Sequence, residues 1–122
     1  MKKIVLLMVS VLFFLGAGSA LANKSAVRME APAHAAQGEK ITITLFVTHS
    51  GNNFFHHTKT VNLMINGQEA ARWDFSAFNL PEAADFSRTF DYVVTGPTTL
   101  ESAAFCNVHG SANTATATVD LQ

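Results

Sequence analysis

Residues 41–48 alternate between apolar and polar side chains, and this two-residue period constrains the fold more than any other feature of the chain. Every second position from 41 to 47 is Ile, Leu or Val, and Thr occupies positions 42, 44 and 48. Successive side chains of a β-strand point to opposite faces of a sheet, so the pattern predicts a strand with one buried face. The same period recurs at residues 61–65, 71–75, 86–94, 100–106 and 115–121.

With a further strand expected near residues 26–31, the chain has about seven predicted strands. The Asn66-Gly67 pair between two of them is a strong hairpin signal, because both residues tolerate positive φ. No segment keeps a helical period over three turns. The pattern therefore predicts an all-β fold, an immunoglobulin-like β-sandwich, whose loops gather at its two ends.

Composition excludes several classes of protein. The 122 residues are enough for one domain, and a hydrophobic fraction of 48% is too high for a disordered chain. Eight Lys and Arg face nine Asp and Glu, so no positive excess is available to bind the phosphates of a nucleic acid. Cys106 is the only cysteine, which excludes a disulfide within one chain.

Residues 1–22 have the form of a secretory signal peptide. Lys2 and Lys3 precede an uncharged apolar run at 4–16, and Ala20-Leu21-Ala22 then supplies the small residues that a signal peptidase reads. The run is shorter than the roughly 20 residues that a membrane-spanning helix needs. We therefore expect cleavage after Ala22, export to the periplasm, a mature domain of residues 23–122 and no membrane association after cleavage.

Export makes the single cysteine informative, because exported thiols normally pair in an oxidising compartment. Cys106 begins the sequence Cys106-Asn107-Val108-His109-Gly110, which closes one predicted strand and opens a turn. Gly110 lets the backbone turn tightly, so that the His109 imidazole can point back toward the thiol. A thiolate with imidazole partners suits iron, copper or zinc. A disulfide between chains and a buried, inert thiol are the alternatives.

The other histidines favour the metal interpretation. His49 ends the strand at 41–48 on its buried parity, and His56 and His57 begin the next one. Together with Cys106 and His109, the strand-end His49 predicts a shared metal ion. His34, and either member of the His56-His57 pair taken alone, is expected to be a solvated surface residue.

Phe105-Cys106-Asn107-Val108-His109-Gly110 resembles the Cys-Asn-x-His-Gly signature of the iron domain of desulfoferrodoxin and neelaredoxin, the superoxide reductases. Residues 48–56, Thr-His-Ser-Gly-Asn-Asn-Phe-Phe-His, resemble the two-histidine loop of the short exported branch of that family. The resemblance covers about residues 27–121. It implies a mononuclear, non-haem Fe²⁺/Fe³⁺ centre with Cys106 as the axial ligand and His49, His56 and His109 as equatorial ligands.

The resemblance also implies a reaction, in which ferrous iron gives one electron to superoxide at an open sixth position and two protons release hydrogen peroxide. Cys106 would be a catalytic residue, and the backbone amide of Asn107 or His109 would donate to its sulfur. The sequence names no electron donor, and association of identical chains is left open.

The segment Asn23-Lys24-Ser25 stands where the family has a Glu-Lys-His-x-Pro loop, so the family's first histidine and its Glu are missing there. Lys24 matches the family's Lys and would attract superoxide, which makes it the second candidate catalytic residue. His57 and His34 are the candidates for a fourth imidazole ligand.

Two other functions compete with superoxide reduction. One is a cupredoxin-like electron-transfer protein, which would also use a sandwich, an upstream His and a Cys-x-x-His. That interpretation lacks the usual axial Met, since no Met follows Met64. The other is a non-enzymatic, immunoglobulin-like metal-binding module.

Overall fold

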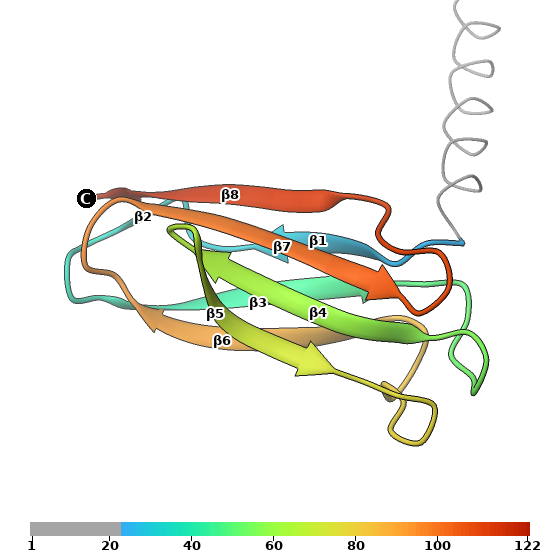
Figure 1. The fold of residues 1–122 in the computed structure, drawn as a ribbon. Coiled ribbons are helices and arrows are strands. Elements are labelled where there is room, and N and C mark those ends of the chain that lie inside the picture. Colours follow the sequence, from blue (N-terminus) through green and yellow to red (C-terminus); the bar gives the residue numbers. More distant parts are fainter. Residues whose placement is uncertain (1–22) are drawn as a thin grey trace, which may run out of the picture.

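Two sheets pack face to face in a computed structural model that describes residues 23–122 (Figure 1). All their strand pairs are antiparallel except that of β2 with β8. The predicted signal peptide, residues 1–22, lies outside the described residues. The eight strands are β1 (Ala26–Glu30), β2 (His34–Ala35), β3 (Lys40–Thr48), β4 (Thr58–Ile65), β5 (Gln68–Asp74), β6 (Phe86–Val93), β7 (Thr98–Cys106) and β8 (Thr114–Leu121). Within residues 23–122, no helix is long and apolar enough to cross a membrane.

One sheet has the strand order β1-β3-β6, and the other has the order β2-β8-β7-β4-β5. The predicted all-β, immunoglobulin-like sandwich is confirmed, and all seven predicted strands are present. The additional strand is β2, whose two residues pair in parallel with the end of β8. Two residues are too few to show a period, so the sequence pattern cannot reveal this strand.

The core lies between the sheets and is formed by the residues that alternation predicted. Ile41, Ile43, Leu45 and Val47 of β3 are at most 3% exposed. The buried face of β7 comprises Leu100, Ser102, Ala104 and Cys106. Each sheet therefore leads to one residue that sequence analysis assigned to the metal site. His49 follows β3, and Cys106 is the last residue of β7.

The loops gather at the two ends of the sandwich, as Figure 1 shows. The turn at Asn66-Gly67 has φ angles of 51° and 81°, the positive values that a tight hairpin of this kind requires. It lies at the end where the chain terminates. The β3–β4, β5–β6 and β7–β8 loops lie at the other end, together with the start of β1. We call this second end the site end.

Candidate metal centre

Two segments distant in sequence, the β3–β4 loop and the end of β7, bring their donor atoms together at the site end. His49 follows β3, His56 lies in the β3–β4 loop, and Cys106 is the last residue of β7. Pairing of Thr58 with Cys106 joins the start of β4 to the end of β7, which places the His56 loop beside the thiol. Ligand atoms of His49, His56 and Cys106 all lie within 4.8 Å of one another, a grouping that can hold a metal ion.

His109 completes the cluster from the turn after β7. Its Nδ1 lies 3.2 Å from Nε2 of His56 and 3.8 Å from Sγ of Cys106. The imidazole rings of His49 and His56 meet edge to face with centroids 4.5 Å apart, and those of His56 and His109 with centroids 5.0 Å apart. The structure therefore brings together the four residues that sequence analysis ranked first as ligands.

The orientation of His49 suits a metal ligand. Its Nδ1 lies 2.7 Å from the carbonyl oxygen of Gly51, and a carbonyl only accepts, so Nδ1–H is the donor. Nε2 is then the atom with the free lone pair, and it is buried without a hydrogen-bond partner. Metal-binding histidines commonly fix one ring nitrogen by a bond to a carbonyl and present the other to the metal.

Burial also sets the protonation of His49. Desolvation lowers the pKa of this imidazole below 6.5, and the neighbouring His56 and His109 lower it further, against backbone hydrogen bonds with Gly51 and Asn23 that raise it. The ring is therefore neutral at pH 7 and able to bind a metal. The backbone N–H of His49 donates to the carboxylate of Asp85, which ties the end of β3 to the β5–β6 loop.

Gly51 contacts two of the candidate ligands. Besides accepting the His49 hydrogen bond, it lies so close to the His56 ring that a Cβ at this position would be 2.5 Å from Nδ1 of His56. Nδ1 of His56 is thereby packed against the backbone, and Nε2 faces His109. A glycine between two histidines of one loop is the signal that sequence analysis passed over.

A tight turn shapes the thiolate site. The backbones of Cys106 and Gly110 bond to each other in both directions, and Gly110 has a φ of 77°, as the predicted tight turn requires. The backbone N–H of Val108 lies 3.4 Å from Sγ of Cys106. Asn107 and His109 were the amides expected to donate there. The turn instead aims the Val108 amide, two residues after the cysteine, at the sulfur.

Asn107 links this turn to the histidine loop. Its carboxamide accepts from the backbone N–H of His57 at 3.0 Å and donates to the carbonyl oxygen of Phe55 at 3.1 Å, while its own N–H donates to the His57 carbonyl. These bonds hold the backbone on both sides of His56. Sequence analysis gave Asn107 no such role, because the contact joins residues about 50 positions apart.

Two other histidines lie outside the group of donors. His57 is 5% exposed, and its Nδ1–H donates to the carbonyl of Asn53 at 3.0 Å, so it helps to shape the loop rather than forming a solvated surface. The surface expectation for His57 is therefore wrong. His34 is exposed, as expected, and lies in β2 at the opposite end of the sandwich, paired with Asp120.

The segment before β1 passes the turn at Cys106–Gly110, with Lys24 exposed and Ser25 fully buried. The Ser25 backbone bonds to Gly110 and Ala112, and its hydroxyl lies 2.8 Å from that of Thr58. Ser25 thus adjoins the site but directs its polar atom to Thr58.

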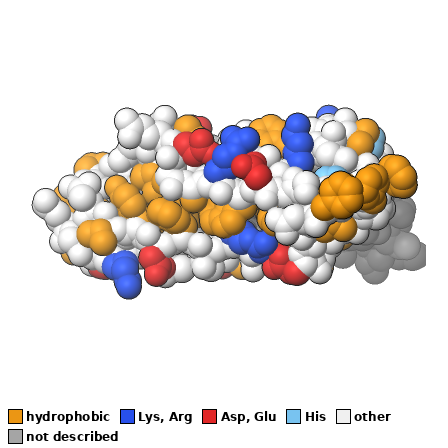
Figure 2. Space-filling model, turned by 60° about the horizontal axis from the view of Figure 1, so that its bottom comes forward, with side chains coloured by type: hydrophobic (Ala, Val, Ile, Leu, Met, Phe, Trp, Pro, Cys, Tyr) orange, Lys and Arg blue, Asp and Glu red, His pale blue; other side chains and the backbone are white. Residues whose placement is uncertain are grey.

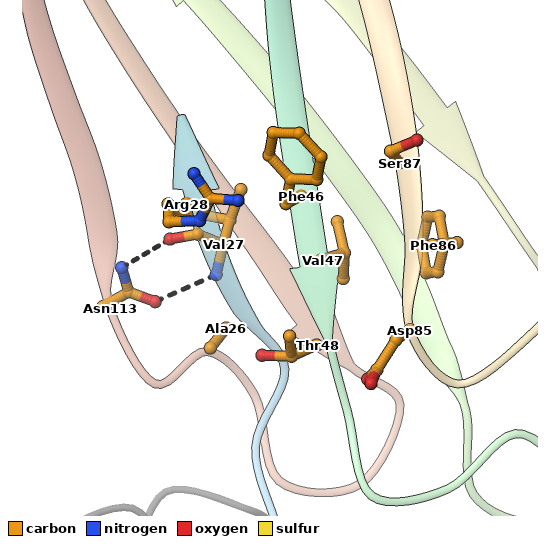
Figure 3. A pocket seen from close by; sticks show the side chains of 10 residues that line it. All are labelled: Ala26, Val27, Arg28, Phe46, Val47, Thr48, Asp85, Phe86, Ser87 and Asn113. Carbon is orange, nitrogen blue, oxygen red and sulfur yellow. Dashed lines mark hydrogen bonds between the residues drawn. The ribbon is translucent and has the colours of Figure 1, made fainter. Parts of the chain in front are cut away.

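A hollow beside the site belongs to the three-stranded sheet (Figure 3). Its floor includes Val27, Val47 and Phe86, and Asn113 closes one side by bonding both backbone groups of Val27. Asp85, which holds the backbone of His49, lies at the end of the hollow nearest the site. The hollow contains none of the four candidate ligands and shapes the site only through Asp85.

The donor set suits an ion of borderline softness. Three imidazole nitrogens and one thiolate exclude calcium and magnesium as natural occupants and match iron, copper or zinc. An unpartnered, buried nitrogen on His49 is a further sign that the cluster fits an ion.

Comparison with known proteins agrees with this geometry. The family model described as desulfoferrodoxin matches residues 18–114. A comparison with curated proteins gives no match. Thirteen solved chains match in structure.

Among these is a variant of the superoxide reductase (neelaredoxin) from Ignicoccus hospitalis, with a TM-score of 0.67, 20% identity and 83% of each chain covered. The reduced superoxide reductase (neelaredoxin) from Archaeoglobus fulgidus has a TM-score of 0.57 and 19% identity, covering 79% of this chain and 89% of its own. The CARDB domain of a Pyrococcus furiosus protein, in complex with di-metal ions, has a TM-score of 0.62 and 17% identity, over 80% and 87%. These identities support the fold alone. The family match spans most of the sequence, including all four residues that converge at the site end, and so this chain belongs to the desulfoferrodoxin family.

Proposed function

We propose that this chain is an exported, periplasmic mononuclear iron protein that reduces superoxide to hydrogen peroxide. The observation that carries the proposal is the meeting of three imidazoles and one thiolate from two distant segments, with Nε2 of His49 buried and without a hydrogen-bond partner. Membership of the desulfoferrodoxin family and structural likeness to superoxide reductases support it.

The chain's own residues would hold the metal and set its environment. His49, His56 and His109 would supply imidazole nitrogens, and Cys106 would supply a thiolate, which donates more electron density to a metal than a nitrogen does. Ferrous iron bound by these residues would supply the one electron that superoxide needs, and two protons would complete hydrogen peroxide. The Val108 N–H directed at the sulfur withdraws charge from it and so tunes the reduction potential.

Lys24 is the proposed electrostatic aid to substrate entry. Lys24 is exposed and adjoins Ser25, whose backbone bonds to Gly110 and Ala112 in the turn after Cys106. A positive side chain near the site would raise the local concentration of an anionic substrate. The proposed effect depends on charge, so it weakens as the ionic strength rises.

The experiment is to express the full chain, purify the protein anaerobically from the periplasmic fraction, and measure its mass, metal content and visible spectra. The proposal expects a mature chain beginning at Asn23, about one iron per chain, a thiolate band that bleaches on reduction, and oxidation by superoxide with stoichiometric peroxide. Copper or zinc in place of iron would contradict it.

A metal-binding module without turnover is the second candidate. The Ser25 hydroxyl, bonded to Thr58, stands in the segment where the family has its first histidine, so the cluster has three imidazoles instead of four. Iron binding without oxidation by superoxide would identify this function.

A further inference from the structure

Three phenylalanines form an exposed apolar patch at the site end, which we call the phenyl patch. Phe54, Phe55 and Phe78 are 49%, 79% and 91% exposed. Their rings touch edge to face, with centroids 5.1 Å apart for Phe54 and Phe55 and 5.5 Å apart for Phe54 and Phe78. Figure 2 shows hydrophobic side chains gathered at this end, next to histidine. A contiguous apolar patch of a few hundred Å² on a monomer is often functional.

The phenyl patch adjoins the metal cluster through the chain itself. Phe55 immediately precedes His56, and its carbonyl oxygen accepts the Asn107 hydrogen bond that secures the loop. Val108, 62% exposed, lies between Cys106 and His109 in the sequence and adds apolar surface near the patch. A partner seated on the phenyl patch therefore comes next to a candidate ligand of the metal.

The stretches that carry the three rings are uncharged. Residues 49–57 and 75–81 contain no Asp, Glu, Lys or Arg, and the exposed acids of the β5–β6 loop, Glu82 and Asp85, follow them. A partner seated on the rings is therefore recognised mainly by apolar contact.

The size of the patch distinguishes between partners. Three rings with these exposures offer about 400 Å² of surface. A stable dimer needs about 800 Å² on each partner, whereas electron-transfer encounters bury less than about 1,200 Å² in total. The area is therefore too small for a permanent pair of identical chains and suits a brief encounter.

We infer that the phenyl patch is the docking surface for a one-electron carrier protein whose cofactor edge is ringed by uncharged, apolar side chains. The inference rests on the proposed function, since each superoxide reduced consumes one electron. On docking, the reduced carrier loses one electron and is oxidised, and the ferric site gains it and becomes ferrous. His56 directly follows Phe55, so it is the candidate ligand closest in sequence to the docking surface.

The test is stopped-flow reduction of the iron-loaded ferric protein by two reductants. One is a reduced blue-copper protein with an apolar docking face, and the other is dithionite, which needs no docking surface. The test variant is the double substitution Phe55→Ser, Phe78→Ser. Val93→Ser is the matched control, since it removes an exposed apolar side chain at the opposite end.

We expect the double variant to lower the second-order rate with the blue-copper carrier by about tenfold, with unchanged rates for dithionite. The wild-type rate with this carrier should change little between low and high salt, and Val93→Ser should react like wild type. Equal carrier rates in the wild type and the double variant would overturn the inference, and so would a parallel loss of the dithionite rate.

Other occupants have their own signatures, and each would also overturn the inference. One is binding of the wild type, but not the double variant, to vesicles of phosphatidylglycerol and phosphatidylethanolamine. Another is a dimer in sedimentation that the double variant abolishes. Failure of the proposed function is distinguishable, because it appears earlier as missing iron or as no reaction of the ferrous protein with superoxide.

Discussion

The two ends of the sandwich are built on the same two sheets, but different kinds of residue form their loops. At the end where the chain terminates, turn residues close the connections, and His34 is the one His or Cys side chain among the described residues there. At the site end, side chains of the β3–β4 loop (His49 and His56) meet side chains from the end of β7 and its turn (Cys106 and His109). At one end of the frame, the turn residues are set by the backbone angles of tight turns. At the other end, they are set by the donor atoms that a metal ion needs.

The two ends also differ in whether their polar atoms have hydrogen-bond partners. At the far end, the Asn66 carboxamide accepts from the backbone N–H of Thr99, which closes the hairpin beside β7. At the site end, Nε2 of His49 and Oδ1 of Asn52 are buried without partners. An unpaired buried polar atom costs about 1–3 kcal/mol. The site end therefore gives up stability that a bound ion would restore at His49.

Removal of the thiolate should have the largest effect. Cys106→Ser should lower iron affinity by more than about 100-fold and abolish the thiolate-to-iron band, because a neutral hydroxyl replaces the charged donor. Metal content and visible spectra measure both effects. His34→Ala is the control at the opposite end and should keep full iron content. Loss of iron in that control would contradict the ligand set.

A methyl group in the histidine loop should come next. Gly51→Ala would place Cβ against Nδ1 of His56, and the ring must move away, so we expect a loss of about 10- to 100-fold in metal affinity. Gly96→Ala is the matched control, since nothing lies within 4 Å of a Cβ there. Competition with a chelator gives the affinities. Equal affinities for the two variants would show that His56 is not constrained by Gly51.

An Asn→Asp substitution at each end of the sandwich compares the two ends directly. Asn107→Asp removes the donor to the Phe55 carbonyl and brings a negative charge near Sγ of Cys106, so we expect about tenfold weaker metal binding and a shifted thiolate band. Asn66→Asp keeps the acceptor that its turn uses and should leave both properties unchanged. Titration with ferrous iron under anaerobic conditions measures the difference.

The smallest expected effect concerns an exposed ion pair at the site end. Arg88 donates two hydrogen bonds to Glu82 and holds the pKa of that carboxyl below 4.5. A lowered folded-state pKa stabilises the fold above the unfolded value, and this contribution is lost as the pH falls through the folded one. Glu82→Gln should therefore destabilise the protein by at most about 1 kcal/mol at pH 7 and by nothing at pH 2. Urea denaturation at both pH values tests this expectation.

The fold was predictable because alternation is a local property of the chain. It placed the seven main strands and the buried parity of β3 and β7, and the Asn66-Gly67 pair fixed one hairpin. The metal cluster was predictable only in part. His49, Cys106 and His109 had strand-end signals, but His57 and His56 are adjacent, and only the contact of His57 with Asn53 separates their roles. The roles of Gly51 and Asn107 depend on which backbone lies opposite them, and that follows from strand pairing rather than from local pattern.

The two sheets contribute different candidate ligands, since His49 continues from β3 and Cys106 ends β7. An ion held by both would act as a cross-link between the layers, the task that a disulfide performs in many exported sandwiches. A single cysteine cannot make that bond, but an ion bound by the folded chain alone would link the two layers and stabilise the fold by its binding free energy. Metal supply would then govern how long the protein survives in its compartment, as well as whether it has a redox centre.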